Sequence, residues 1–230
     1  MNDFFNYFSR LSKPVIIAGG CSVMGFSAFA IYSYFKHKRR MMIDEGFVDQ
    51  NVVDESINKV LVLGLEGSGK STFLSHLAKI DGNIYEPDNT KEFNVLSVVC
   101  HPHKSLNFWE IGGSKSHRVY WSNFVQDTDL LVYVVDAADE HKLAESVKEL
   151  HILIACDKLK NVPIFILANK QDLKNAFSPM DIADAFEVPE LTKYYKIAVH
   201  PLEMPPDAQP RNESVMFIKN VISYWLSMLK

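Results

Sequence analysis

Cysteine and net charge are both scarce in this sequence of 230 residues, and each scarcity excludes a class of protein. The three cysteines, Cys21, Cys100 and Cys156, lie far apart without metal-ligand spacing. A disulfide framework is therefore not expected, and a reducing compartment fits. The formal net charge is only -4, which gives no sign of nucleic-acid binding. Because 47% of the residues are hydrophobic, the chain can form one ordinary domain with an appendage.

Charge is missing altogether from residues 14–35, a run of 22 residues from Pro14 to Phe35. As a helix rising about 1.5 Å per residue, this run would be roughly 33 Å long, enough to cross a bilayer. A buried core helix and a cleavable signal peptide, with Ala28-Phe29-Ala30 as the cleavage site, are the alternatives. We favour a permanent single-pass transmembrane helix, because core helices seldom run this long without a charge.

The charges that flank this run predict its orientation. Two basic residues precede it and four follow it, so the positive-inside rule places the C-terminal side in the cytosol; these residues are Arg10, Lys13, Lys36, Lys38, Arg39 and Arg40. The expected organisation is a short segment at 1–13, a membrane helix at 14–35, a basic and then acidic linker at 36–58, and a domain at 59–230. The mitochondrial outer membrane and the endoplasmic reticulum both suit such a span.

Beyond the linker, short apolar runs alternate with helical segments. Runs of this kind are typical of strands buried on both faces, and alternating β and α units predict a mostly parallel sheet with helices on both sides. The expected strands are Lys59–Leu65, Phe93–Cys100, Ser105–Ile111, Asp129–Asp136 and Val162–Ala168. The expected helices are Lys70–Ile80, Glu140–Leu159, Pro179–Phe186 and a last one capped by Asn212-Glu213-Ser214.

A phosphate-binding loop is the clearest motif. Gly64–Ser71 matches G-x-x-x-x-G-K-[ST], with a strand expected before it and a helix after it. Backbone N–H groups of such a loop converge on phosphate oxygens, and the helix dipole favours the negative charge. Lys70 would reach the β- and γ-phosphates, and the Ser71 hydroxyl would bind Mg²⁺.

A second motif selects the base. Asn169-Lys170-Gln171-Asp172 follows directly on an expected strand. The Asp172 carboxylate can accept hydrogen bonds from both N1–H and the 2-amino group of guanine, a pair that adenine does not offer. Asn169 would meet the O6/N7 edge and the Lys170 stem would cover the ring. This motif favours GTP over ATP, and it argues against an ATP-using kinase or motor.

These motifs together resemble an Arf-like small GTPase, a branch of the Ras superfamily, from Lys59 to Lys230. The resemblance rests on the stretches Gly64–Thr72 (GLEGSGKST), Thr90–Val95 (TKEFNV), Trp109–Gly113 (WEIGG) and Asn169–Leu173 (NKQDL). It implies a Ras-like G domain of the P-loop NTPase class, an α/β fold with a mostly parallel six-stranded sheet. It also implies a GTP/GDP switch whose loops are ordered by the γ-phosphate and Mg²⁺.

The resemblance assigns roles residue by residue. Thr90 and Ser71 would bind Mg²⁺, and Glu110 would hold it through a water. The catalytic group would consist of Gly113, which donates its N–H to the γ-phosphate, of Lys70, and of Ser114, which occupies the position where the family has Gln. Ala198, expected after the last strand, would approach guanine O6, although Ile197-Ala198-Val199-His200 fits the family signature poorly. The nucleotide would thus contact Glu66, Gly67, Ser68, Gly69, Lys70, Ser71, Thr72, Thr90, Gly113, Asn169, Lys170, Asp172 and Ala198.

Several positions depart from the family pattern. Glu110 replaces the usual Asp, and Ser114 replaces the Gln that orients the attacking water, for which serine is too short. Slow hydrolysis is therefore expected, with a constitutively GTP-bound scaffold that recruits effectors as the alternative. The family's N-terminal myristoyl glycine is absent, because residue 2 is Asn2, so the transmembrane span would replace that anchor.

The family also suggests partners. Three aromatic residues, Phe93, Trp109 and Phe124, match its effector-binding patch; the alternative is that they are half-buried core residues. Together with the switch loops they would contact effector proteins. An exchange factor and an activating protein are further expected partners, and nucleic acid is not.

Overall fold

The computed structural model describes residues 58–85, 93–100, 104–155, 157–205 and 212–228. The expected membrane helix at 14–35 and Thr90 lie outside these residues. Within the described ranges, no helix combines the length and the apolar character that crossing a bilayer requires.

A six-stranded sheet organises the described residues, in the order β2-β3-β1-β4-β5-β6. Only β2 runs antiparallel to its neighbour, and the other pairs are parallel, as predicted. The strands are β1 (Asn58–Leu63), β2 (Phe93–Cys100), β3 (Lys104–Ile111), β4 (Leu130–Asp136), β5 (Ile164–Asn169) and β6 (Ile197–Pro201).

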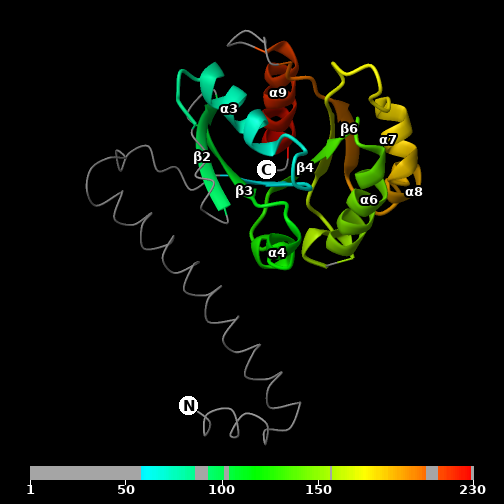
Figure 1. Cartoon of the computed structure of the whole chain (residues 1–230). Helices are drawn as coiled ribbons and strands as arrows, with labels where there is room; N and C mark the ends of the chain where they lie inside the picture. The colour runs from blue at the N-terminus through cyan, green and yellow to red at the C-terminus, as the bar shows by residue number, and fades with distance from the viewer. Residues whose placement is uncertain (1–57, 86–92, 101–103, 156, 206–211, 229–230) are drawn as a thin grey trace, which may run out of the picture. The chain divides into compact units, whose positions relative to one another are not determined.

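Helices cover both faces of this sheet (Figure 1). On one face, α3 (Lys70–Ile80) and α9 (Glu213–Met228) pack on buried residues of β1 and β4 such as Val62 and Val132. On the other, α6 (Glu140–Ile154) and α7 (Pro179–Ala185) bury side chains such as Leu150 against Tyr133. The short helices are α4 (Lys115–Arg118), α5 (Trp121–Phe124), η1 (Asp157–Leu159) and α8 (Val188–Leu191).

Most predicted elements are confirmed, and the differences lie at their ends. The strand expected to reach Leu65 ends at Leu63, because Gly64 turns the chain with a φ of 144°. The helix expected over Glu140–Leu159 ends at Ile154, and residues 157–159 form a separate 3₁₀ turn. Helices α4, α5 and α8 have about one turn each, too short for a hydrophobic period to reveal them.

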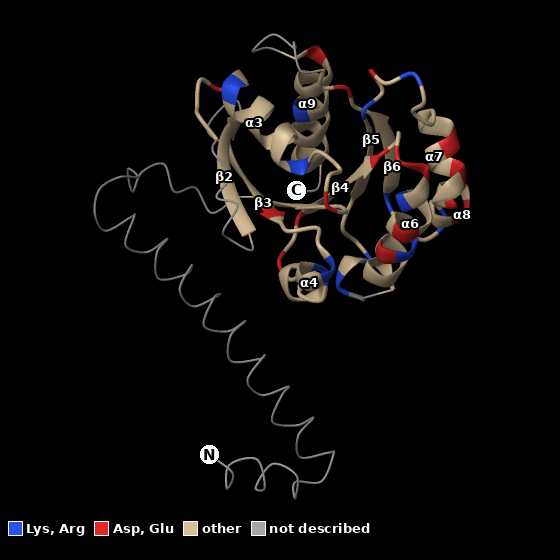
Figure 2. Ribbon diagram, in the orientation of Figure 1, with Lys and Arg blue, Asp and Glu red and all other residues tan. Residues whose placement is uncertain are grey.

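Basic and acidic residues are spread over the described elements, with several acidic residues on α7 and α8 (Figure 2). In contrast, the central strands β1, β4 and β5 are almost entirely buried and carry no exposed residue. In an open α/β sheet, loops at the carboxyl ends of such strands form the ligand site. The motifs at Gly64 and Asn169 both follow strands at this edge.

Candidate functional site

The phosphate loop joins the end of β1 to the start of α3. Gly69 caps α3 in the left-handed region, with a φ of 99°. A Cβ at this position would lie 2.2 Å from the Asn169 Nδ2 atom, so only glycine lets the two motifs pack together. Glu66 and Gly67 are exposed at the tip of the loop, and Thr72 is exposed on the first turn of α3. The backbone of the loop, rather than these side chains, forms the cradle.

Lys70 lies beneath this loop and is only 6% exposed. Its Nζ atom donates hydrogen bonds of 3.0 Å to the carbonyl oxygens of Gly64 and Leu65. Burial lowers the pKa of Lys70 to about 8, although Glu110 and Glu66 act against this by attraction. A buried cation whose bonds go to neutral carbonyls fits an anion that binds at this loop.

Two oxygen-bearing side chains meet beside Lys70. The Ser71 hydroxyl donates to one carboxylate oxygen of Glu110 at 2.5 Å, and the Tyr85 hydroxyl donates to the other at 2.7 Å. Glu110 is 5% exposed, and burial together with this hydrogen bond raises the pKa of Tyr85. Hydroxyl and carboxylate oxygens are suitable ligands for Mg²⁺. Among the described residues no three His, Cys, Asp or Glu side chains gather, so a metal here would need phosphate or water oxygens as well.

The base-recognition motif continues from β5. Asn169 is 2% exposed, and its Nδ2 atom donates to the Ser68 carbonyl oxygen at 2.8 Å. Its Oδ1 atom and the Ser68 hydroxyl are buried without a hydrogen-bond partner among the described residues, which fits a polar ligand at this point. Lys170 has a φ of 67° and its Nζ atom binds Asp136 at 2.5 Å, whereas Asp172 is exposed.

Ala198 does not follow the last strand, as expected from the sequence, but lies within it. Ala198 lies inside β6, where it pairs with Phe165 of β5. Asn169 lies four residues beyond Phe165, at the end of β5, so Ala198 is not level with the base-recognition motif. Leu202 follows β6 instead, and its carbonyl oxygen accepts from the Gln171 N–H at 3.2 Å. The next loop also brings Met204 Cε within 3.5 Å of the Cβ position of Gly69. No motif signals Leu202 or Met204, because they belong to the proline-rich stretch Pro201–Pro210.

The segment Gly112–Arg118, which follows β3, completes this edge. Gly113 packs so closely on the phosphate loop that an added Cβ would lie 2.3 Å from the Gly64 carbonyl oxygen. The Gly113 carbonyl oxygen accepts from the Glu66 N–H at 3.1 Å. Ser114 precedes α4, and its hydroxyl lies 3.0 Å from His117 Nδ1. Tyr85 and Arg118 are the contacts that motif analysis missed, because their importance depends on partners distant in sequence.

The three aromatic residues expected to bind effectors lie together. The rings of Phe93 and Trp109 stack with centroids 6.3 Å apart, and Phe124 lies 5.8 Å from Phe93. All three are half-buried. Lys59 Nζ lies 5.3 Å from the centroid of the Trp109 ring and donates to the Phe124 and Gln126 carbonyl oxygens. This arrangement combines a packed inner side with an accessible outer side.

Comparisons with known proteins agree with these motifs. The sequence profile of the ADP-ribosylation factor family matches residues 47–205. ADP-ribosylation factor-like protein 3 of Chlamydomonas reinhardtii is 41% identical over 130 residues, which cover 56% of this chain and 72% of the relative. The protein of the same name from Caenorhabditis elegans is 42% identical over 124 residues, 54% of this chain and 66% of the relative.

A relative from Drosophila and a solved structure are also similar to this chain. ADP-ribosylation factor-like protein 2 of Drosophila melanogaster is 35% identical over 137 residues, 60% of this chain and 73% of the relative. The Arl6 BBS3 small GTPase from Trypanosoma brucei, solved with the nucleotide analogue GppNp, superposes with a TM-score of 0.65 at 17% identity. That match covers 76% of this chain and 100% of the other, and it establishes the shared fold.

Proposed function

The chain belongs to the ADP-ribosylation factor family of small GTPases, and we propose that it is a slowly hydrolysing GTP switch held on a membrane by residues 14–35. Members of this family bind GTP or GDP with Mg²⁺, and they interact in general with effectors and regulators. The observation that carries the proposal is the buried Lys70 beneath a complete phosphate loop, against which Asn169 packs.

Different residues would bind the phosphates, the base and the metal ion. The loop N–H groups and Lys70 would hold the phosphates, and Asn169, Lys170 and Asp172 would hold guanine. The loop after β6, rather than Ala198, would lie beside the base, since Leu202 contacts the base motif. Mg²⁺, held by Ser71 and Thr90 and through water by Glu110, would neutralise phosphate charge.

Hydrolysis is the step for which this chain is least equipped. A water must attack the γ-phosphorus while the bond to the bridging oxygen breaks, and positioning of that water contributes much of the rate. Ser114 stands where relatives have the longer Gln, and its hydroxyl is engaged with Ser116 and His117. Single-turnover release of γ-phosphate from GTP-loaded protein tests this, and a rate equal to that of Gln-bearing relatives would contradict it.

A second candidate function is a GTP-loaded scaffold that does not hydrolyse and recruits effectors constitutively. Ser114 and Glu110, the two departures from the family pattern, favour it. The nucleotide extracted from purified protein distinguishes the candidates. Stoichiometric GTP supports the scaffold, mostly GDP supports the slow hydrolase, and no guanine nucleotide contradicts both.

We place effector binding on the Phe93, Trp109 and Phe124 patch with the switch loops. Half-buried aromatic residues are frequent anchors in interfaces. The membrane would be the mitochondrial outer membrane or the endoplasmic reticulum, with the GTPase domain in the cytosol. Imaging residues 1–40 fused to a fluorescent protein tests this, and a diffuse cytosolic signal would contradict the anchor.

A further inference from the structure

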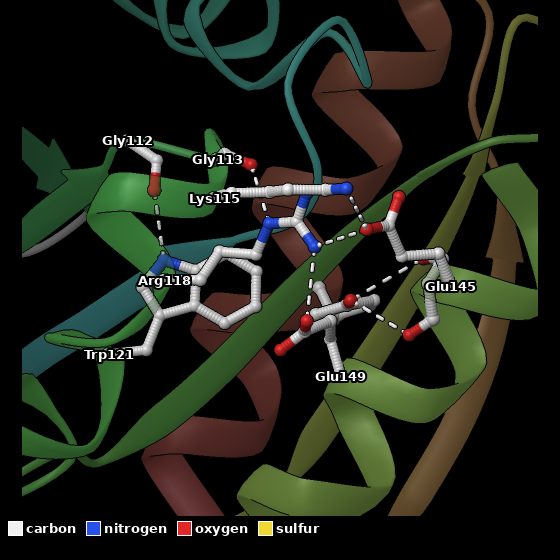
Figure 3. A network of polar contacts seen from close by, with 9 residues as sticks. Gly112, Gly113, Lys115, Arg118, Trp121, Glu145 and Glu149 are labelled. Carbon is white, nitrogen blue, oxygen red and sulfur yellow. Dashed lines mark hydrogen bonds and ion pairs between the residues drawn. The ribbon is translucent and has the colours of Figure 1, made fainter.

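Arg118 connects the segment after β3 to α6, a helix that contains none of the predicted nucleotide-binding residues. Its side chain is only 9% exposed. The Nε atom donates to the Gly113 carbonyl oxygen at 2.9 Å, and Nη1 donates to Glu145 and Glu149 at 3.0 Å each. Figure 3 shows the guanidinium between the Gly113 carbonyl on one side and the two carboxylates of α6 on the other.

The group that Arg118 holds lies directly against the phosphate loop. The Gly113 carbonyl oxygen also accepts from the Glu66 N–H, and a Cβ on Gly113 would lie 2.5 Å from the Glu66 nitrogen. One residue earlier, the Gly112 carbonyl oxygen accepts from Trp121 Nε1 at 2.9 Å (Figure 3). Successive peptide carbonyls are therefore fixed by side chains of α4 and α5.

The charges in this network stabilise one another and hold the guanidinium in place. The hydrogen bonds and charge of Arg118 hold the pKa of Glu145 below its usual range, with Lys115 adding a smaller attraction. The two carboxylates in turn raise the pKa of Arg118, although burial opposes this. A planar guanidinium can serve a carbonyl and two carboxylates at once, which a lysine ammonium on a flexible stem does less well.

We propose that Arg118 is a positioning residue that holds Gly113 against the phosphate loop, so that α6 sets the preference for a triphosphate over a diphosphate. This inference rests on the proposed function, in which the Gly113 N–H contacts the γ-phosphate. A segment that is already held in place loses less conformational freedom when the γ-phosphate binds. The lower free-energy cost of ordering makes GTP bind more tightly. GDP lacks the γ-phosphate, so its affinity is expected to change little.

A purely structural role for Arg118 predicts something different. If the network only packs α4 and α5 onto α6, its loss lowers the stability of the domain and weakens both nucleotides equally. The ratio of the two affinities therefore separates the interpretations. A change in unfolding temperature alone does not separate them.

The test uses the full-length chain in detergent and the variant Glu145→Gln/Glu149→Gln, which keeps the side-chain volumes. The matched control is Glu140→Gln, an exposed residue at the start of the same helix. Displacement of a fluorescent nucleotide gives the affinities for a non-hydrolysable GTP analogue and for GDP. Arg118→Lys serves as a second variant, because it retains the charge but not the fork.

We expect the double variant and Arg118→Lys to bind the GTP analogue about fivefold to thirtyfold more weakly, which is the lower part of the usual range of conformational coupling, while GDP affinity stays within about twofold. The control should change neither affinity. Equal losses for both nucleotides, or no loss for either, would overturn the inference but leave the proposed function standing. A wild-type chain that binds neither nucleotide would contradict the proposed function itself, and the inference with it.

Discussion

The phosphate loop and the segment Gly112–Arg118 touch each other but are held in different ways. The loop is shaped by its own backbone and by Lys70 and Asn169, two buried residues that belong to the recognised motifs themselves. The second segment is held by Arg118 at its own end and by the partners of Arg118 on α6, and no motif marks these residues. The comparison teaches that motif residues make the contacts of the loop, whereas the proposed response to the γ-phosphate would depend on residues that no motif marks.

Replacement of Lys70 should have the largest effect on the loop. Lys70→Met keeps the apolar stem but removes the buried cation that would face the phosphates. Loss of one partner of a buried charged contact costs about 2–5 kcal/mol, so we expect nucleotide affinity to fall at least about 30-fold. Equilibrium dialysis against GDP and a GTP analogue measures this. The exposed Lys79→Met, on the same helix, is the control, and an unchanged affinity in Lys70→Met would contradict our view of the loop.

Alanine at the two glycines should weaken the second segment unequally. In Gly113→Ala the new Cβ meets the backbone of the phosphate loop, whereas in Gly112→Ala it meets the rotatable side chain of His117. Backbone cannot yield as a side chain can, so we expect about a tenfold loss of GTP-analogue affinity for Gly113→Ala and a smaller loss for Gly112→Ala. Nucleotide titration of the two variants side by side measures the difference. Equal losses would show that the close packing on the loop is unimportant.

Restoring the family residue should sharpen the contrast between binding and turnover. We expect Ser114→Gln to raise the single-turnover hydrolysis rate about tenfold, because the longer amide can position the water, while nucleotide affinity stays the same. Ser116→Gln, the same change two residues later, is the control. If Ser114→Gln hydrolyses GTP no faster than the wild type, Ser114 does not limit the reaction.

The sequence predicts the first region well and the second poorly, for physical reasons. Gly64–Ser71 and Asn169–Asp172 carry their geometry in consecutive residues, and the mostly parallel sheet follows from the alternation of strands and helices. Arg118, Tyr85 and Leu202 act through partners far away in the chain, at Glu149, Glu110 and Gln171. The sequence places Ala198 after the last strand instead of inside β6, because a poor motif match gives no reliable strand end.

Lys59, which lies beside the aromatic patch of Phe93, Trp109 and Phe124, is a third region for comparison. Its replacement is expected to have the smallest effect, a change in how stability depends on pH. Burial lowers the pKa of Lys59 from 10.5 to about 8, although Asp127 and Asp129 oppose this. Between these pH values the unfolded chain binds more protons at this residue than the folded chain. Lys59 therefore makes the free energy of unfolding rise with pH across this window.

Urea unfolding of the wild type and Lys59→Met at pH 7 and pH 9.5 checks this expectation. The stability difference between the two should shift in favour of the wild type at the higher pH. Nucleotide affinity at pH 7 should be the same in both, because Lys59 lies at the opposite end of β1 from the phosphate loop. Identical pH dependence in the two proteins would contradict the assignment of the shift to Lys59.

Recognition of guanine is the central claim, and Asp172→Asn tests it most directly. An asparagine can donate to the 2-carbonyl of xanthine but cannot accept from both guanine donors. The measurement is the affinity of full-length wild type and variant for GDP and xanthosine diphosphate, with the exposed Asp184→Asn as control. We predict that the variant loses about 100-fold in GDP affinity and prefers xanthosine diphosphate. A variant that still binds GDP as tightly as the wild type would contradict the account.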